Sequence, residues 1–164
     1  MNTNISRLNE SDMQYLRRCL ALAQAALAAG DQPFGSVLAD AAGSVLAEAR
    51  NRNREIGPLA HPEFELADWA THNLTADERS SSTLYTSGEH CPMCSAAHGW
   101  ARLGRIVYIA SSKQFVQWQR ELGIAASPVA ALPIQSVVAD IEVIGPVDSL
   151  SDEIKALHVQ YYAS

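Results

Sequence analysis

The sequence has no dense cluster of basic residues. Its 164 residues contain 12 Lys and Arg against 18 Asp and Glu, a formal net charge of −6. The tightest basic groups are short: Arg17-Arg18, and the alternating set Arg50, Arg52 and Arg54. Proteins that grip a nucleic-acid backbone usually show a basic patch, because neutralising phosphates supplies much of their affinity. A nucleic-acid partner is therefore disfavoured.

The sequence also lacks a long apolar run. Residues 1–10 are polar and hold no apolar core of a signal peptide, and no stretch approaches the roughly 20 apolar residues of a membrane span. We therefore expect a cytoplasmic protein without membrane contact. Cysteines are few, three in all, and Cys91 and Cys94 stand close together. Without an export signal, that pair indicates a metal or redox site before a disulfide.

What is present fits one folded domain, residues 1–164, with 48% hydrophobic and 18% charged residues. Ser11 and Gln14 are expected to form the capping box of the first helix. Helices are expected over about 11–30, 62–73, 92–104, 113–122 and 151–162, and strands over 35–39, 44–49, 83–86, 106–110 and 137–143. The first two strands form a hairpin, and helices then alternate with strands. This order predicts an α/β fold of three layers, α/β/α, around a mixed sheet.

Two short motifs, His61–Glu63 and Cys91–Cys94, carry the chemistry. Each stands at the predicted start of a helix, with proline in the first helical position. The positive end of a helix favours thiolate over thiol, which suits Cys91 and Cys94 as metal ligands. One imidazole, from His61, and two thiolates make a three-ligand Zn²⁺ site that leaves the fourth position for water.

Glu63 is the expected proton carrier of this site. Zinc lowers the pKa of bound water from about 15.7 to about 7. A carboxylate two residues from His61 can border the metal without binding it, take the proton of that water and pass it to a leaving amine. His-x-Glu combined with a later Cys-x-x-Cys is the known signature of zinc deaminases.

Three alternatives stay open. A structural zinc would need a fourth ligand, for which His98, one turn after Cys94, is better placed than His90. A thioredoxin-like redox pair would leave the His61–Glu63 helix unexplained. A catalytically inactive, zinc-stabilised interaction protein would not need the carboxylate of Glu63 beside its metal.

These motifs resemble the cytidine deaminase-like superfamily, in the branch that contains guanine deaminases and tRNA adenosine deaminases. The resemblance covers nearly the whole chain. It runs through Pro33-Phe34-Gly35, a post-strand asparagine, His-x-Glu, Cys-x-x-Cys with an internal methionine, and the strand 105–109. It implies a five-stranded mixed sheet flanked by helices, one zinc ion per chain, and a homodimer.

The resemblance also implies substrate contacts. Asn51, with Asn53 as the alternative register, is expected to hydrogen-bond the substrate ring, although either residue can instead support a turn. Phe34 is expected to line the pocket or to belong to the core. The backbone of Ala60 and Cys91 is expected to face the ring and the attacked carbon.

Two departures and the chain end bear on the substrate. Pro62 replaces the alanine, and His90 the proline, that are usual in this family. His90 is an added substrate contact, a support behind the metal site, or a solvated loop residue. Tyr161 and Tyr162 either stack on the ring or pack the last helix against the body. Asp140 and Glu142 are two further acidic residues that are able to contact an amino-bearing ring.

The expected substrate is a small free base. Guanine comes first, with aminopyrimidines and aminotriazines close behind and nucleosides also open. Adenosine within tRNA is the alternative, which the acidic composition and the absence of a basic last helix disfavour. The sequence therefore predicts a zinc-dependent hydrolytic deaminase that releases ammonia from an amino-heterocycle.

Overall fold

The computed structural model describes residues 5–164. Its elements, in chain order, are η1 (Ile5–Arg7), α1 (Glu10–Ala28), β1 (Gly35–Ala39), β2 (Val45–Arg50), α2 (Pro62–Asn73), α3 (Ala76–Ser81), β3 (Thr83–Gly88), α4 (Pro92–Ala101), β4 (Arg105–Ala110), α5 (Ser112–Glu121), η2 (Ile134–Ser136), β5 (Val143–Ile144) and α6 (Asp148–Ala163).

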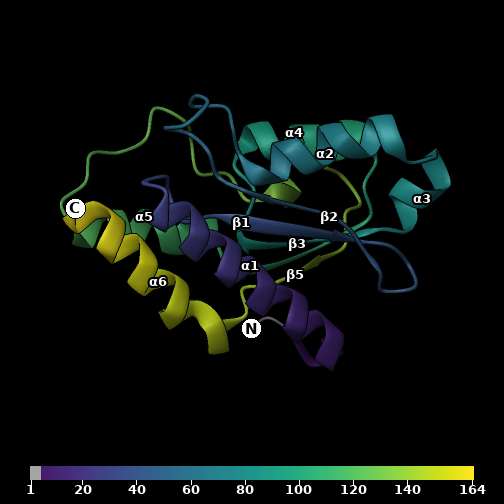
Figure 1. Ribbon diagram of the computed structural model, residues 1–164, viewed down its shortest axis with the longest axis horizontal. Helices are drawn as coiled ribbons and strands as arrows, with labels where there is room; N and C mark the ends of the chain where they lie inside the picture. The colour runs from purple at the N-terminus through teal and green to yellow at the C-terminus, as the bar shows by residue number, and fades with distance from the viewer. Residues whose placement is uncertain (1–4) are drawn as a thin grey trace.

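Five strands form one mixed sheet in the order β2-β1-β3-β4-β5. β1 pairs antiparallel with β2 and β3, whereas β3, β4 and β5 run parallel. α2 and α4 lie together over one face of the sheet, and α1 and α6 lie over the other (Figure 1). The predicted α/β/α fold with a five-stranded mixed sheet is confirmed.

The core is divided by the sheet, because residues two apart in a strand share a face. Val37 and Tyr85 pack with the buried side of α1 and α6. Leu38 and Leu84 point to the other face, where they pack with Leu66 of α2. All five residues of β1 are buried, as expected for a strand with helices on both faces.

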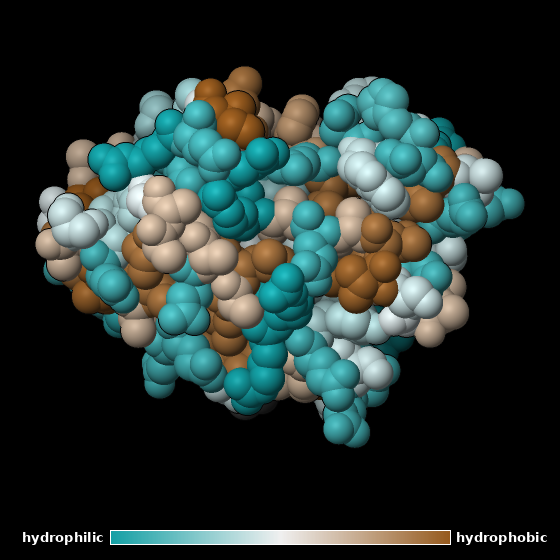
Figure 2. Space-filling model, in the orientation of Figure 1, coloured by the Kyte–Doolittle hydropathy of each residue, from teal (hydrophilic) through white to brown (hydrophobic). Residues whose placement is uncertain are grey.

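The surface mixes polar and apolar groups. On the face shown in Figure 2, hydrophobic residues form several separate groups among hydrophilic ones. In the described part of the chain, no helix is both long and apolar enough to cross a membrane.

The start of α1 differs from the prediction. Asn9, not Ser11, is the N-cap: its side chain accepts a hydrogen bond from Asp12 N, and the Asp12 carboxylate accepts one from Asn9 N, each at 2.9 Å. The helix begins two residues earlier than Ser11 would allow because Asp12 has further partners. Its carboxylate also accepts hydrogen bonds from Tyr85 and Arg105, on two strands beneath the helix.

The bounds of other elements also differ from the predicted ones. The fifth strand, predicted over 137–143, is confined to Val143–Ile144. The segment before it turns instead, with η2 at 134–136 and Asp140 in the left-handed region at φ 56°. The last helix begins at Asp148, three residues before the predicted start. The short helix α3 was not predicted, although Thr75 and Glu78 form its capping box.

Candidate zinc and catalytic site

Two helix N-termini build the site. His61 is the N-cap of α2 and Cys91 is the N-cap of α4, both with extended backbone and with proline following. Neither side chain makes a capping hydrogen bond, so both are available as metal ligands. α2 and α4 pack against each other, and Cys94 follows in the first turn of α4.

The donor atoms of His61, Cys91 and Cys94 converge within 4.8 Å of one another. His61 Nδ1 lies 3.7 Å from Cys91 Sγ and 3.5 Å from Cys94 Sγ. Zinc bonds of ordinary length in a tetrahedral arrangement separate nitrogen from sulfur by about 3.6 Å. The residues therefore fit zinc. Within residues 5–164, these three form the one such group of histidine, cysteine and acidic side chains.

The two cysteines have different charge states before metal binds. The hydrogen bond from Cys94 and the one from His61 lower the pKa of Cys91 to about 4. The same sulfur–sulfur contact, together with burial, raises the pKa of Cys94. His61 has a raised pKa because it donates a hydrogen bond to Cys91. Since zinc takes cysteine as thiolate, metal binding releases protons at this site.

Glu63 lies beside the ligands without being one of them. The carboxylate is buried, with Oε1 accepting a hydrogen bond from Thr86 Oγ1 at 2.9 Å and Oε2 lying 3.8 Å from Cys94 Sγ. Burial raises the pKa of Glu63 to about 7, although His61 and the Thr86 hydroxyl oppose the shift. A group with such a pKa is suited to carry a proton in both directions near neutral pH.

Asn51 and Asn53, in the loop between β2 and α2, both have structural roles. Asn51 is buried, its backbone N donates to Phe34 O at 2.9 Å, and its Oδ1 accepts from Asn53 N at 2.8 Å. The side-chain oxygen of Asn53 is bonded to Gln32 N. Asn51 thus supports a turn through its oxygen, and its amide nitrogen is the group that can donate to a ligand.

The backbone of Ala60 is bonded within its own loop. Its N donates to Gly57 O at 3.0 Å and its O accepts from Arg52 N at 3.0 Å. Of the two groups, only the carbonyl oxygen can accept a further hydrogen bond, because it has two lone pairs.

Phe34 belongs to an aromatic cluster. Its ring centroid lies 5.3 Å from that of Phe115 and 4.8 Å from that of His158, and both rings come from the layer of α5 and α6. Tyr161 and Tyr162 pack on each other at 5.2 Å, and Tyr162 OH accepts from Gln119. These contacts agree with the packing interpretation of the tyrosines.

His90 is fully buried, so the solvated-loop interpretation is wrong. Its ring packs edge-on against His98, with centroids 5.1 Å apart, and it has no exposed surface to offer a substrate. His98 Nε2 contacts Gly104 O at 2.9 Å. Neither histidine belongs to the metal-binding group, which leaves the structural-zinc alternative without its fourth ligand.

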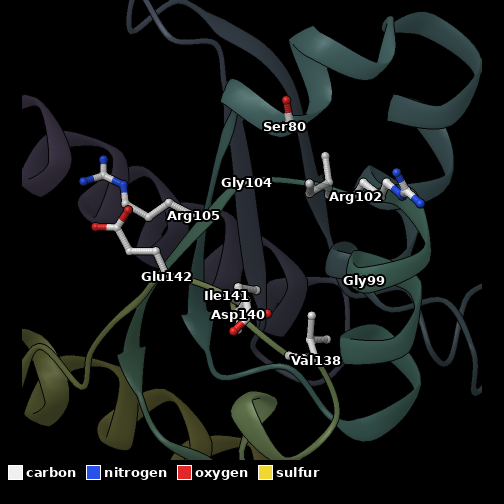
Figure 3. A pocket seen from close by; sticks show the side chains of 11 residues that line it. Ser80, Gly99, Arg102, Gly104, Arg105, Val138, Asp140, Ile141 and Glu142 are labelled. Atoms are coloured by element: carbon white, nitrogen blue, oxygen red, sulfur yellow. The ribbon is translucent and has the colours of Figure 1, made fainter.

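Asp140 and Glu142 lie at the wrong end of the sheet to contact a substrate. They line a hollow of about 400 Å³ with Arg102 and Arg105 (Figure 3). Arg105 begins β4, beside the start of its parallel neighbour β3, whereas the metal cysteines follow the end of β3. Glu142 is also ion-paired with Arg7 at 3.0 Å.

Sequence reasoning missed three polar residues around the site. Ser36 and Thr86 link the sheet to Glu63. Glu89 is buried and accepts hydrogen bonds from Ser112 N and Ile134 N, the first residues of α5 and η2. Each of the three is a polar side chain on or directly after a buried strand, and that position was the available signal.

Three converged nitrogen and sulfur donors beside a buried, unliganded carboxylate define a zinc-dependent site of the deaminase class. The family described as the cytidine and deoxycytidylate deaminase zinc-binding region matches residues 9–110. The chain belongs to this family, and with it to the hydrolases that act on C–N bonds.

Three of the curated proteins that are similar to this chain are described as deaminases. The chain is 30% identical over 118 residues to a probable cytosine deaminase of Schizosaccharomyces pombe, covering 72% of each chain. It is 37% identical over 98 residues to the guanine deaminase of Bacillus subtilis, covering 58% of this chain and 62% of that one. It is 35% identical over 104 residues to the tRNA-specific adenosine deaminase of Haemophilus influenzae, covering 63% and 60%.

Solved structures share the fold. The guanine deaminase of Nitrosomonas europaea superposes with a TM-score of 0.68 at 22% identity, over 92% of this chain and 84% of that one. The guanine deaminase of Bacillus subtilis superposes with a TM-score of 0.58 at 28% identity, over 77% and 83%.

Proposed function

We propose that this protein is a hydrolytic deaminase of a small amino-heterocycle, with guanine-like free bases as its first substrate class. The observation that carries the proposal is the buried carboxylate of Glu63, 3.8 Å from a cysteine of the zinc site yet outside its ligand set. A purely structural metal site has no use for such a group.

His61, Cys91 and Cys94 would hold the metal. When bound, zinc supplies a water that is activated near neutral pH. Glu63 takes a proton from water and delivers it to the departing amino group, so that ammonia leaves and the ring gains an oxygen. Asn51, through its amide nitrogen, the Ala60 carbonyl and the ring of Phe34 orient the base.

The guanine-like class is supported by the identity to the Bacillus guanine deaminase and by the acidic composition of the chain. Aminopyrimidines follow, on the identity to the probable cytosine deaminase, and aminotriazines after them. A-to-I deamination of tRNA is the second candidate, on the identity to tRNA-specific adenosine deaminases. An inactive, zinc-stabilised interaction protein is the remaining alternative.

The test is ammonia release by the zinc-loaded protein from guanine, cytosine, a diaminotriazine, cytidine and tRNA. We expect release from a free base, and Glu63→Gln is expected to lower kcat by about 10²- to 10⁴-fold, the usual contribution of acid–base catalysis. Glu65→Gln is the matched control, because Glu65 is in the same helical turn but pairs with Arg52 at 3.0 Å.

Each outcome decides between the candidates. Activity on tRNA alone would replace the free-base substrate. No release from any compound would favour the inactive interaction protein. Full activity in Glu63→Gln would refute the proton-carrying role of Glu63.

We also propose that the protein is a cytoplasmic homodimer. Zinc-binding thiols persist in a reducing compartment.

The dimer is supported by large apolar side chains that are exposed on α4 and in the loop before α2: Trp100 is 89% exposed, Leu59 67% and Ile56 61%. Such groups are common where proteins associate. Light scattering should give twice the mass of the chain for the wild type. The double variant Leu59→Ser and Trp100→Ser should give the mass of a single chain. A monomeric wild type would refute the dimer.

A further inference from the structure

Glu63 is the end of a row of hydrogen-bonded side chains. Ser36 Oγ donates to Thr86 Oγ1 at 2.9 Å, and Thr86 Oγ1 donates to Glu63 Oε1 at 2.9 Å. Ser36 and Thr86 are directly opposite each other in the β1–β3 ladder. All three side chains are buried. The row therefore runs from the middle of the sheet to the carboxylate without contact with solvent.

The row occupies one end of an otherwise apolar face. Ser36 shares its face of β1 with Leu38, and Thr86 shares its face of β3 with Leu84. Both leucines belong to the core between the sheet and the helices α2 and α4, which carry the metal ligands. Buried hydroxyls are costly unless they are bonded, and valine would fill the place of Thr86 with almost the same shape. The acceptor Glu63 is what explains a hydroxyl here.

We propose that Thr86 is a positioning residue for the reaction: its hydroxyl holds Oε1 of Glu63, so that Oε2 is the oxygen that transfers the proton. The inference rests on the proposed role of Glu63. Oε2 lies on the side of the metal ligands, 3.8 Å from Cys94 Sγ, whereas Oε1 is bonded to the sheet. The carboxylate cannot rotate to exchange its oxygens without breaking the Thr86 bond.

Ser36 sets the direction of that bond. A threonine hydroxyl has one proton, which rotates toward whichever acceptor is available. Because Ser36 donates into Thr86 Oγ1, the Thr86 proton is left to point at Glu63. Without the Ser36 hydroxyl, the Thr86 hydroxyl can still donate to Glu63, but nothing fixes its proton in that direction. Its effect should therefore be smaller than the loss of the Thr86 hydroxyl.

The test compares Thr86→Val, Thr86→Ser and Ser36→Ala on the base that the wild type deaminates fastest in the panel above. We expect Thr86→Val to lower kcat by about 10- to 100-fold, the scale of a misplaced acid–base group. KM should stay within about twofold, and zinc content should stay at one per chain, because the hydroxyl touches neither substrate nor metal. Thr86→Ser should restore kcat to within about threefold of wild type, and Ser36→Ala should fall between.

Urea unfolding supplies the structural control. Ser82→Ala removes another buried hydroxyl, one that donates to Arg79 O at 2.7 Å. Ser82 is the C-cap of α3 and stands before β3 begins. Ser82→Ala should lower stability as Thr86→Val does while leaving kcat unchanged.

Three results would overturn the proposal. They are wild-type kcat in Thr86→Val, equal losses in Thr86→Val and Thr86→Ser, and a loss of kcat that only follows lost zinc or lost folding. Failure of the proposed function looks different. In that case Glu63→Gln would retain kcat, whatever Thr86→Val did.

Discussion

At the scale of single residues, Cys19 and Cys91 show how the position of a side chain determines its chemistry. Cys19 lies inside α1 with no exposed surface, among the apolar residues of the core. Burial raises the pKa of its thiol, which makes it inert. Cys91, at the start of a helix and hydrogen-bonded to Cys94 and His61, has a pKa of about 4. The same side chain is a core residue in one place and a thiolate in the other.

This difference predicts the effect of removing each thiol. Cys91→Ala should weaken zinc binding by more than about 100-fold, since loss of even an outer partner of a metal ligand costs 10- to 100-fold. The stability of Cys91→Ala in zinc-free buffer should change by less than about 1 kcal/mol, because the half-buried side chain caps no backbone group and loses only its contacts with His61 and Cys94. Cys19→Ala is the reverse: zinc stays bound, and stability falls by about 1 kcal/mol.

Zinc content by elemental analysis and urea unfolding without metal separate the two effects. Full zinc binding by Cys91→Ala would mean that this cysteine is not a ligand.

At the scale of elements, strong local patterns predicted the structure well. α2 was predicted to begin at the proline after His61 and to end at about residue 73, and the structure agrees over 62–73. The metal ligands were predicted from their residue types and spacing, and all three lie at the N-cap or in the first turn of a helix. Local sequence was sufficient for these features, although it did not reveal α3, whose capping box of Thr75 and Glu78 is equally local.

Two features that depend on distant contacts were not predicted. The start of α1 depends on Asp12, whose carboxylate is bonded to Tyr85 and Arg105 more than seventy positions away. The row from Ser36 to Glu63 likewise exists only because β1 and β3 are paired in one particular register. No period or motif in the sequence reports such pairings. This is why Thr86 was missed while Glu63, two residues from a ligand, was found.

At the scale of the whole molecule, His158 joins parts that are far apart in sequence. It lies on α6 against Phe34, which precedes β1, and against Phe115 and Trp118 of α5. None of these three aromatic neighbours is charged. Lys155 of the same helix lies over the Trp118 ring, with its Nζ 5.9 Å from the ring centroid. The imidazole is therefore held in apolar surroundings that favour its neutral form.

The stability of the molecule should consequently depend on acid through this residue. Burial lowers the pKa of His158 from 6.5 to about 3, although a hydrogen bond with the backbone of Pro33 opposes the shift. Between those pH values the unfolded chain binds a proton that the folded chain does not. Stability is thus complete above about pH 6.5 and falls, by up to about 1.4 kcal/mol per pH unit, as the pH drops through the window.

His158→Phe should remove this share of the acid sensitivity. We expect the difference in unfolding free energy between about pH 7.5 and about pH 5 to shrink by at most about 2 kcal/mol relative to the wild type. Buried His90 and His98 also have lowered pKa values, so a residual slope of the same sign should remain. Parallel pH curves for wild type and His158→Phe in zinc-saturated urea titrations would show that the imidazole is not held neutral by the aromatic cluster.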